Sequence, residues 1–332
     1  MKFETIIALR GLAAIIIALF HFSGGWAGYL AVEFFLVLCG FVLSHAYLYS
    51  SFAATPMQFI TRRLVRLYPM HIFTLLSFTA VFFLSEHYLP PANDGRLFTF
   101  GQQVTLTHNI GLNPNGLAWN RPGWFVSVIF WVNLFFFFFI NKQTKSSSIF
   151  IISVLGFSLI YFNTGHLDVT AGNYYGVINS GLVRGISSFL LGIISYRIFL
   201  DIHDNQWIRR HCTALELCSV VAIGLVVFCR SSKYSAIDFL APFLFMLVLP
   251  LFSMEQGILS RHLRNYQILG EISFSLYLNQ TTVLLITALL LNRINTHRLF
   301  DLAVYMMLLL GYSYLTHFYL DKKLGNIRFG KD

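Results

Sequence analysis

Four basic side chains lie where chemistry is expected in an otherwise apolar chain. Two of them, Arg10 and His21, are eleven residues apart in the first apolar run. At 3.6 residues per turn this spacing is about three turns, so both share one helix face, with His21 roughly 16 Å deeper. Ionisable residues inside membrane spans are costly and are therefore functional candidates. The pair predicts a tunnel with a cation at its cytoplasmic mouth and an imidazole near the middle of the membrane.

The other two basic side chains open the third apolar run. Arg63 and Arg66 are three residues apart, on neighbouring positions of one helix face. Arginine forks bind phosphate with two-point geometry, so several arginines at the depth of Arg10 predict a phosphate cradle. Ordinary anchoring at the cytoplasmic face is the alternative, and it accounts for the adjacent Arg62 most directly.

Purely structural roles stay open for Arg10 and His21, and several roles stay open for the other ionisable groups. Arg10 and His21 also fit a snorkelling arginine and a hydrogen-bonded core histidine. Glu33, the lone acid of the second run, could pair with an arginine, orient His21, or reach the headgroup zone. The other histidines are interpreted as structural or interfacial, and His71, near Arg66, is the strongest candidate among them. No set of carboxylates and histidines has metal-ligand spacing, so no metal is expected.

The composition defines the environment in which this chemistry would take place. The 332 residues are 56% hydrophobic, 17% aromatic and only 11% charged, with a mean hydropathy of +0.67. Ordinary soluble domains are about 45–50% apolar and about 25% charged. The chain is therefore predicted to be an all-α, polytopic integral membrane protein. The net charge of +9 lies in short loops between apolar runs, so no nucleic-acid partner is expected.

About 20 mostly apolar residues are needed to span a bilayer, and a window of that length finds ten candidate helices. They lie near 6–22, 30–48, 64–85, 123–140, 149–163, 181–200, 213–229, 236–253, 269–291 and 299–320. The fifth and seventh are short. The first is interpreted as a retained helix and not as a signal peptide, because no cleavage site follows it. We expect one transmembrane domain over residues 1–332.

Basic residues in the loops predict the orientation. With a cytoplasmic N-terminus, sixteen of the 23 Lys and Arg residues fall on the cytoplasmic side and six on the outer side. Ten spans then place both termini in the cytoplasm. The longest hydrophilic stretch, 86–122, is assigned to the outer side, with an interfacial helix expected over Leu97–Leu112. It is either a functional loop or a tolerated insertion.

Several motifs resemble those of the membrane acyltransferase-3 family. Arg10 and His21 match its first motif, and the Arg-x-x-Arg at 63–66, followed by Leu-Tyr-Pro, matches its second. Further matches are 32–41 with "VdlFFvlSGF", 122–128 with "PxWSLSvE", 184–192 with "Rg…FllG" and 269–278 with "LGkiSYslYL". The resemblance extends over essentially the whole chain in order.

The resemblance implies a ten-helix, membrane-bound O-acyltransferase acting on groups other than aminoacyl. Its implied reaction transfers an acyl group, most simply acetyl, from acyl-CoA to a hydroxyl of a polysaccharide, lipopolysaccharide or other glycan. The expected partners are acyl-CoA, a glycan or lipid-linked sugar, and the lipids of a bacterial inner membrane. Acetyl-CoA would be a co-substrate, and no tightly bound cofactor is expected.

The resemblance also assigns roles to residues. His21 would be the base or a transient acyl carrier, assisted by Arg10, and the acyl-CoA would be bound by Arg10, Arg63 and Arg66. Further candidates for lining the site are Glu33, Trp124, Ser127, Arg184, Tyr277 and Gln280.

Three departures from the family pattern leave other functions open. Ile129 stands in place of a glutamate, Gln280 in place of a histidine and Cys39 in place of a serine. An inactive relative that scaffolds polysaccharide assembly would explain the first two losses. The other alternative is a transporter or flippase of a lipid-linked sugar, with the arginines gripping its phosphate.

Overall fold

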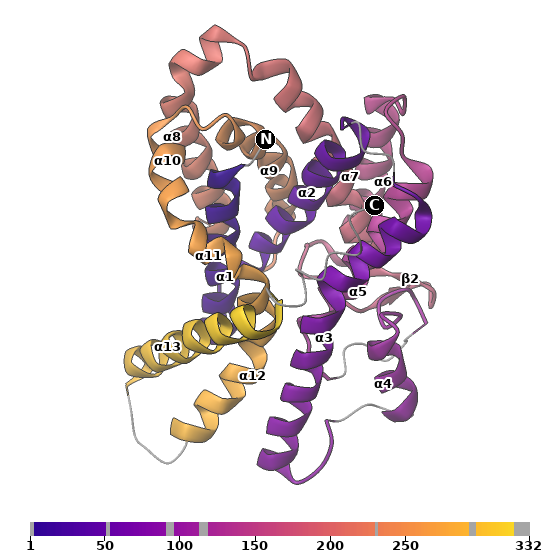
Figure 1. Cartoon of the computed structure of the whole chain (residues 1–332), viewed down its shortest axis with the longest axis vertical. Helices are drawn as coiled ribbons and strands as arrows, with labels where there is room; N and C mark the ends of the chain where they lie inside the picture. Colours follow the sequence, from indigo (N-terminus) through magenta and orange to yellow (C-terminus); the bar gives the residue numbers. More distant parts are fainter. Residues whose placement is uncertain are drawn as a thin grey trace. The chain divides into compact units, whose positions relative to one another are not determined.

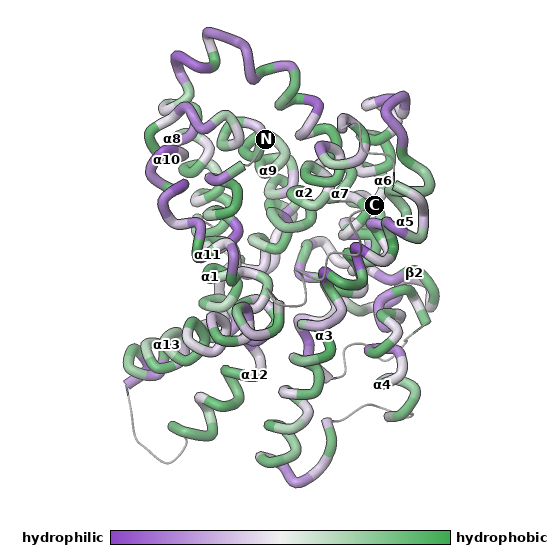
Figure 2. Tube along the Cα trace, in the orientation of Figure 1, coloured by the Kyte–Doolittle hydropathy of each residue, from purple (hydrophilic) through white to green (hydrophobic). Residues whose placement is uncertain are grey.

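The protein is almost entirely helical where its structure is described. A computed structural model describes residues 3–50, 54–90, 96–112, 119–229, 232–291 and 297–321 (Figure 1). Over these ranges the strands are limited to one antiparallel pair, β1 (Asn173–Tyr174) and β2 (Ile178–Asn179). Apolar residues dominate the long helices, and hydrophilic ones gather at their connections (Figure 2). The predicted all-α, polytopic membrane fold is confirmed.

Nine helices in the described ranges are long and apolar enough to cross a membrane. They are Glu4–Ser23, Gly28–Leu48, Pro56–Glu86, Ser146–Thr164, Ser180–Ile202, Gln206–Phe228, Ala236–Ser253, Ser273–Leu291 and Arg298–Leu320. The remaining predicted span, 123–140, is the apolar helix α5 (Gly123–Phe139), whose 17 residues fall short of the usual length. The two spans expected to be short, at 149–163 and 213–229, contain 19 and 23 residues because each helix continues into flanking polar residues.

The chain divides into two compact units, and each is described here by itself. Unit 1 comprises residues 1–54, 132–169 and 180–271. Its helices are α1 (Glu4–Ser23), α2 (Ala31–Leu43), α6 (Ser146–Thr164), α7 (Ser180–Ile202), α8 (Gln206–Phe228), α9 (Leu240–Ser253), α10 (Ile258–Leu263) and α11 (Gln267–Glu271). Unit 2 comprises residues 55–131, 170–179 and 272–332. Its helices are α3 (Pro56–Glu86), α4 (Arg96–Val104), α12 (Ser273–Leu291) and α13 (Arg298–Thr316), and it holds the first part of α5.

Two glycines allow a close crossing of α2 and α7 in unit 1. A Cβ on Gly40 of α2 would lie 2.0 Å from the carbonyl oxygen of Phe189, and one on Gly192 of α7 would lie 1.9 Å from that of Val37. Small residues let helix backbones approach closely in membranes, where packing rather than the hydrophobic effect drives association. Both glycines belong to the family-like motifs, so this crossing gives those motifs a physical role.

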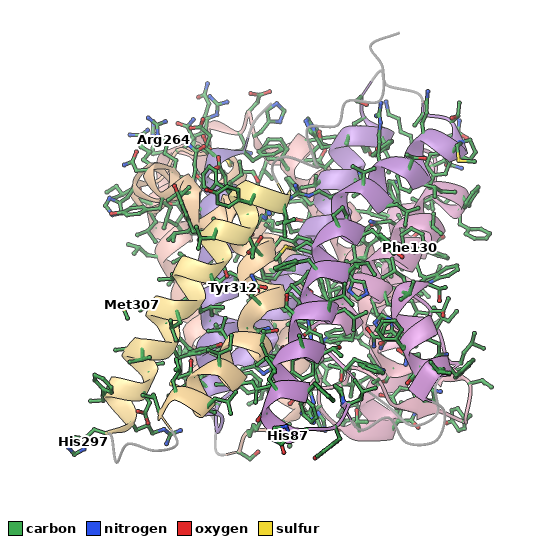
Figure 3. All side chains as sticks on the ribbon, turned by 60° about the horizontal axis from the view of Figure 1, so that its bottom comes forward. His87, Phe130, Arg264, His297, Met307 and Tyr312 are labelled. Atoms are coloured by element: carbon green, nitrogen blue, oxygen red, sulfur yellow. The ribbon has the colours of Figure 1, made fainter. Side chains whose placement is uncertain are left out.

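Two helix ends of unit 2 lie where the predicted outer loops would place them, at one end of the unit. His87 caps the C-terminal end of α3 and His297 the N-terminal end of α13, and both lie at the same end of the unit (Figure 3). The interfacial helix expected over Leu97–Leu112 is shorter, because α4 ends at Val104 and the chain then turns inward to bury His108.

Candidate functional site

Helix α1 carries both Arg10 and His21. It is continuous from Glu4 to Ser23, so the two side chains keep their spacing of about three turns. Arg10 is half-buried two turns into the helix, and His21 is exposed in its last turn. The depth of His21 in the membrane stays a prediction. A helix of 20 residues is about 30 Å long, the thickness of the hydrocarbon core, and His21 lies two residues before the C-terminal end of α1.

The start of α1 is held by contacts with the segment from Glu255 through α10 and α11. The Thr5 amide donates to Glu255 Oε1 over 2.9 Å, and the Thr5 hydroxyl donates to the Ser260 carbonyl over 2.9 Å. A Cβ on Gly270 would lie 1.7 Å from the carbonyl oxygen of Ile7, so only glycine permits this approach. These contacts hold the helix that presents Arg10.

Glu33 and Arg184 form a buried ion pair inside unit 1. Arg184 Nε donates to Glu33 Oε1 over 2.5 Å, and both side chains are almost fully inaccessible to solvent. The Ser188 hydroxyl donates to the other carboxylate oxygen. The two terminal guanidinium nitrogens donate to the carbonyls of Val169 (3.1 Å) and Tyr29 (3.2 Å). Of the alternatives for Glu33, pairing with an arginine is the one that the structure displays.

Arg63 and Arg66 lie in the first turns of α3, in unit 2. The helix begins at Pro56, eight residues before the predicted span, because Thr55 and Gln58 form a capping box. Arg63 is half-buried with its guanidinium carbon 5.4 Å from the centroid of the Phe59 ring, and Arg66 is exposed. Since Arg10 belongs to unit 1, the shared phosphate cradle stays a prediction.

Three other candidates are buried in unit 2. The Ser127 hydroxyl donates to the Leu106 carbonyl over 2.7 Å, which ties α5 to the chain after α4. Tyr277 packs edge-on against Phe125 at 5.3 Å between centroids, and Trp124 is also buried. These contacts pack the three residues within unit 2, and their role as a site lining stays a prediction.

Two of the departures from the family pattern lie on buried faces of unit 2. Ile129 of α5 is 3% exposed, so an apolar side chain fills the position of the missing acid. Gln280 of α12 is fully buried, and neither amide atom has a hydrogen-bond partner among the described residues. Unpaired buried polar groups cost about 1–3 kcal/mol, which makes the Gln280 amide a candidate for binding a polar ligand or a water molecule. Cys39, in unit 1, is half-buried in α2.

A buried histidine pair in unit 2 was missed by the sequence reasoning. The rings of His71 and His108 are parallel, with centroids 5.9 Å apart. His71 Nε2 lies 2.9 Å from the Gln103 carbonyl, and His108 Nε2 lies 3.0 Å from that of Gly123. Burial, followed by the neighbouring His71, lowers the pKa of His108 to about 4. The two histidines are 37 residues apart, and no sequence spacing indicates that they meet.

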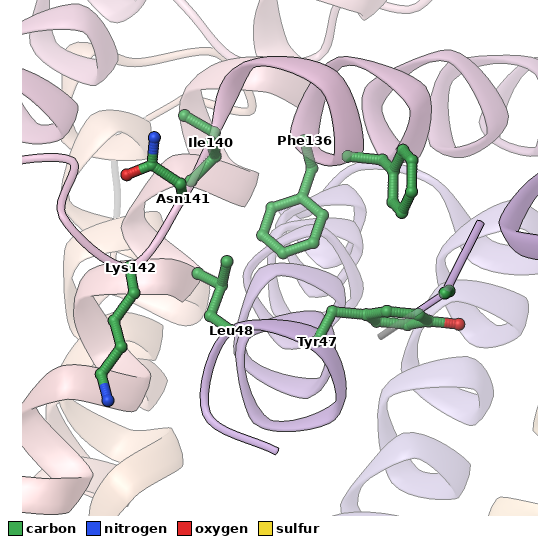
Figure 4. Close-up of a pocket in the computed structure, with 8 residues that line it drawn as sticks. Tyr47, Leu48, Phe136, Ile140, Asn141 and Lys142 are labelled. Carbon is green, nitrogen blue, oxygen red and sulfur yellow. The ribbon is translucent and has the colours of Figure 1, made fainter. Parts of the chain in front are cut away.

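A cavity of about 320 Å³ in unit 1 contains none of the predicted site residues. Its lining includes Tyr47, Leu48, Phe136, Ile140, Asn141 and Lys142, at the ends of α5 and of the turn after α2 (Figure 4). Within the described ranges no group of three His, Cys, Asp or Glu side chains is placed to hold a metal ion.

Comparisons with known proteins agree with the helical architecture and the motifs. The family model described as "Acyltransferase domain" of the acyltransferase-3 type matches residues 3–319. The chain is 37% identical over 89 residues to "Protein 2 in picA locus" of Rhizobium radiobacter, a match covering 24% of this chain and 46% of that protein. The chain thus spans about half the length of this relative. No solved structure matches the chain.

Proposed function

Because this chain belongs to the acyltransferase-3 family, we propose that it transfers an acyl group, most simply acetyl, from acyl-CoA to a glycan hydroxyl. Membership makes it a membrane acyltransferase, and the donor, the acyl chain and the glycan are our proposal. The observation that carries it is helix α1, an unbroken span that presents Arg10 two turns from its start and His21 in its last turn. The proposed location is a bacterial inner membrane.

His21 supplies the base in this proposal. Its imidazole accepts the proton of the acceptor hydroxyl while the oxygen attacks the thioester carbonyl. The tetrahedral intermediate then expels the thiolate: the C–S bond breaks, the new C–O bond remains, and the imidazolium returns the proton to sulfur. The products are the glycan ester and free CoA. In the alternative route His21 carries the acyl group transiently before the hydroxyl takes it. The exposed side chain of His21 allows an acceptor to reach it.

The arginines serve the donor in this proposal. Guanidinium groups stay charged at all physiological pH values and bind phosphate through paired N–H donors. We assign this role to Arg10 on α1 and to Arg63 and Arg66 on α3. Arg10 and Arg63 are each half-buried within their own unit, and charge-assisted hydrogen bonds are stronger where part of the solvent is excluded.

The test follows CoA release by the purified protein. Acetyl-CoA is the donor, and the acceptor is surface polysaccharide extracted from the strain that carries this gene and de-O-acylated with mild alkali. We expect His21→Ala to lower kcat/KM by about 100-fold or more, the usual loss when a general base is removed. We expect Arg10→Ala to raise the KM for acetyl-CoA about tenfold, since one charge-assisted contact is worth about 1.4 kcal/mol or more.

His297→Ala is the matched control, because His297 is exposed and its side chain makes no cap hydrogen bond at the start of α13. Full turnover by a well-folded His21→Ala protein would overturn the assignment of His21. Movement of a lipid-linked sugar across vesicles without CoA release would replace acyl transfer with transport. If the wild-type protein neither releases CoA nor moves the lipid-linked sugar, the inactive scaffold is the function that remains.

A further inference from the structure

The outer end of α1 is surrounded by aromatic side chains of unit 1. The buried Phe20 ring lies 5.2 Å from the His21 ring, centroid to centroid. Edge contacts join Phe20 to Trp26 at 6.3 Å and to Tyr29 at 5.6 Å. The ammonium of Lys233 lies 5.1 Å from the Phe20 centroid. His21 is therefore one residue away from a cation held against aromatic rings.

Lys233 continues this group toward the surface. Its ammonium donates to the Tyr234 hydroxyl over 3.0 Å and lies 3.5 Å from a carboxylate oxygen of Asp168. Tyr234 in turn stacks on the ring of His166 at 4.3 Å. Burial alone would lower the pKa of Lys233, but the bonds to Tyr234 and Asp168 outweigh it and raise that pKa. The ammonium therefore stays charged at neutral pH.

A buried carboxylate connects the loops that carry these side chains. Asp238 is fully buried, and its Oδ2 accepts from the Tyr29 hydroxyl over 2.6 Å and from the Leu167 amide over 2.9 Å. One carboxylate thus joins the connections after α1, after α6 and before α9. The surface above it is held in a defined arrangement, as a binding site requires.

The exposed members of this group have the chemistry that binds sugar rings. Tyr234 is 47% exposed, and Trp26, Lys233, Asp168 and His166 are half-buried. Sugars present C–H groups on their ring faces and hydroxyls at their rims. Aromatic rings with a polar tip suit the faces, and a lysine beside a carboxylate offers both a donor and an acceptor to the hydroxyls. The charge bias also assigns these three loops to the outer side.

We infer that Trp26, Asp168, Lys233 and Tyr234 form the acceptor subsite, which holds a sugar unit of the glycan with its hydroxyl toward His21. This inference rests on the proposed function. It differs from an ordinary belt of interfacial aromatics, which anchors a protein at the headgroup level and needs no ion pair between its rings. These four side chains are positioning residues, because none of them touches the reacting carbonyl in this scheme.

The experiment distinguishes an effect on acceptor binding from an effect on donor binding. Initial rates with the purified protein are measured against de-O-acylated polysaccharide at saturating acetyl-CoA, and against acetyl-CoA at saturating polysaccharide. We expect Tyr234→Ala and Lys233→Ala each to raise the KM for polysaccharide at least fivefold, with the KM for acetyl-CoA unchanged. Tyr234→Phe should raise it less than Tyr234→Ala. Tyr266→Ala is the control, an exposed aromatic residue between α10 and α11.

Each result decides the inference. Unchanged KM for polysaccharide in both alanine variants overturns it. If both alanine variants lose thermal stability to the same extent while that KM is unchanged, the inference is also overturned, and the residues are those of an interfacial aromatic belt. If the wild-type protein releases no CoA, binding of fluorescently labelled polysaccharide is measured instead. Binding that Tyr234→Ala weakens then supports the subsite while the acyl-transfer proposal fails, and wild-type protein that does not bind overturns the subsite.

Discussion

Arg184 Nε donates to Glu33 Oε1 over 2.5 Å in the interior of unit 1, between α7 and α2. The two residues are 151 positions apart in the chain. Charged side chains at membrane depth usually pair with one another or with backbone carbonyls, and Arg184 does both. The pair joins the same two helices about two turns away from Gly40 and Gly192, so α2 and α7 are held by an ion pair as well as by close packing.

Removing one member of this pair should be much worse than removing both. Arg184→Leu leaves the Glu33 carboxylate buried without its guanidinium, although the Ser188 hydroxyl still donates to it, and such a loss costs about 3–5 kcal/mol. The double variant Glu33→Leu with Arg184→Leu should recover at least about 1 kcal/mol of that loss, because no buried charge is left unpaired. Unfolding in mixed detergent micelles measures both. A double variant less stable than Arg184→Leu would contradict the pairing.

The crossing of α2 and α7 gives a second prediction. Gly192→Ala places a Cβ against the carbonyl oxygen of Val37, so the helices must separate. We expect a loss of about 1–3 kcal/mol in the free energy of unfolding, typical of overpacking. Gly224→Ala in α8 is the control, because nothing lies within 4 Å of its added Cβ. There alanine should stabilise the helix by about 0.5–1 kcal/mol. Equal effects at the two positions would refute close packing as the reason for Gly192.

His108 predicts how stability depends on pH. Burial lowers its pKa from 6.5 to about 4 in the folded protein, so below pH 6.5 the unfolded chain binds a proton that the folded protein does not. Stability is therefore lost as the pH falls from about 6.5 toward 4. Between pH 7 and pH 5 this group should cost about 2 kcal/mol.

His108→Gln removes this titration while keeping a polar side chain opposite the Gly123 carbonyl. Thermal unfolding of both proteins at pH 7 and pH 5 should show the smaller acid loss in the variant. Identical losses would mean that His108 does not titrate across this range.

Hydropathy predicted most of the helices because a span needs a long apolar run, and such runs are visible without neighbours. It placed the start of α3 eight residues late, since Arg62, Arg63 and Arg66 lower the local hydropathy while the capping box at Thr55 already begins the helix. It also shortened the span at 213–229, because α8 begins among polar residues from Gln206.

The site was predictable only where its residues share one helix. Arg10 and His21 lie on α1, so their spacing is fixed by helix geometry, although the end of α1 and hence the depth of His21 depend on where the chain turns. The partner of Glu33 and the pairing of His71 with His108 are tertiary contacts, and residue spacing carries no information about them.

Gln280 tests whether this chain has kept a working site after losing the family histidine. Its amide is buried without a partner among the described residues. Gln280→Leu therefore replaces an uncompensated polar side chain with an apolar one of similar volume. If the amide has no function, the variant should gain about 1 kcal/mol of stability at unchanged turnover. If the amide binds substrate or an ordered water, as we expect, CoA release should fall about tenfold or more, since losing one substrate hydrogen bond costs about 1.4 kcal/mol. Thr287→Val on the same helix is the control, because that buried hydroxyl already donates to the Val283 carbonyl. Turnover that survives Gln280→Leu, together with a rise in unfolding temperature, would remove Gln280 from the site.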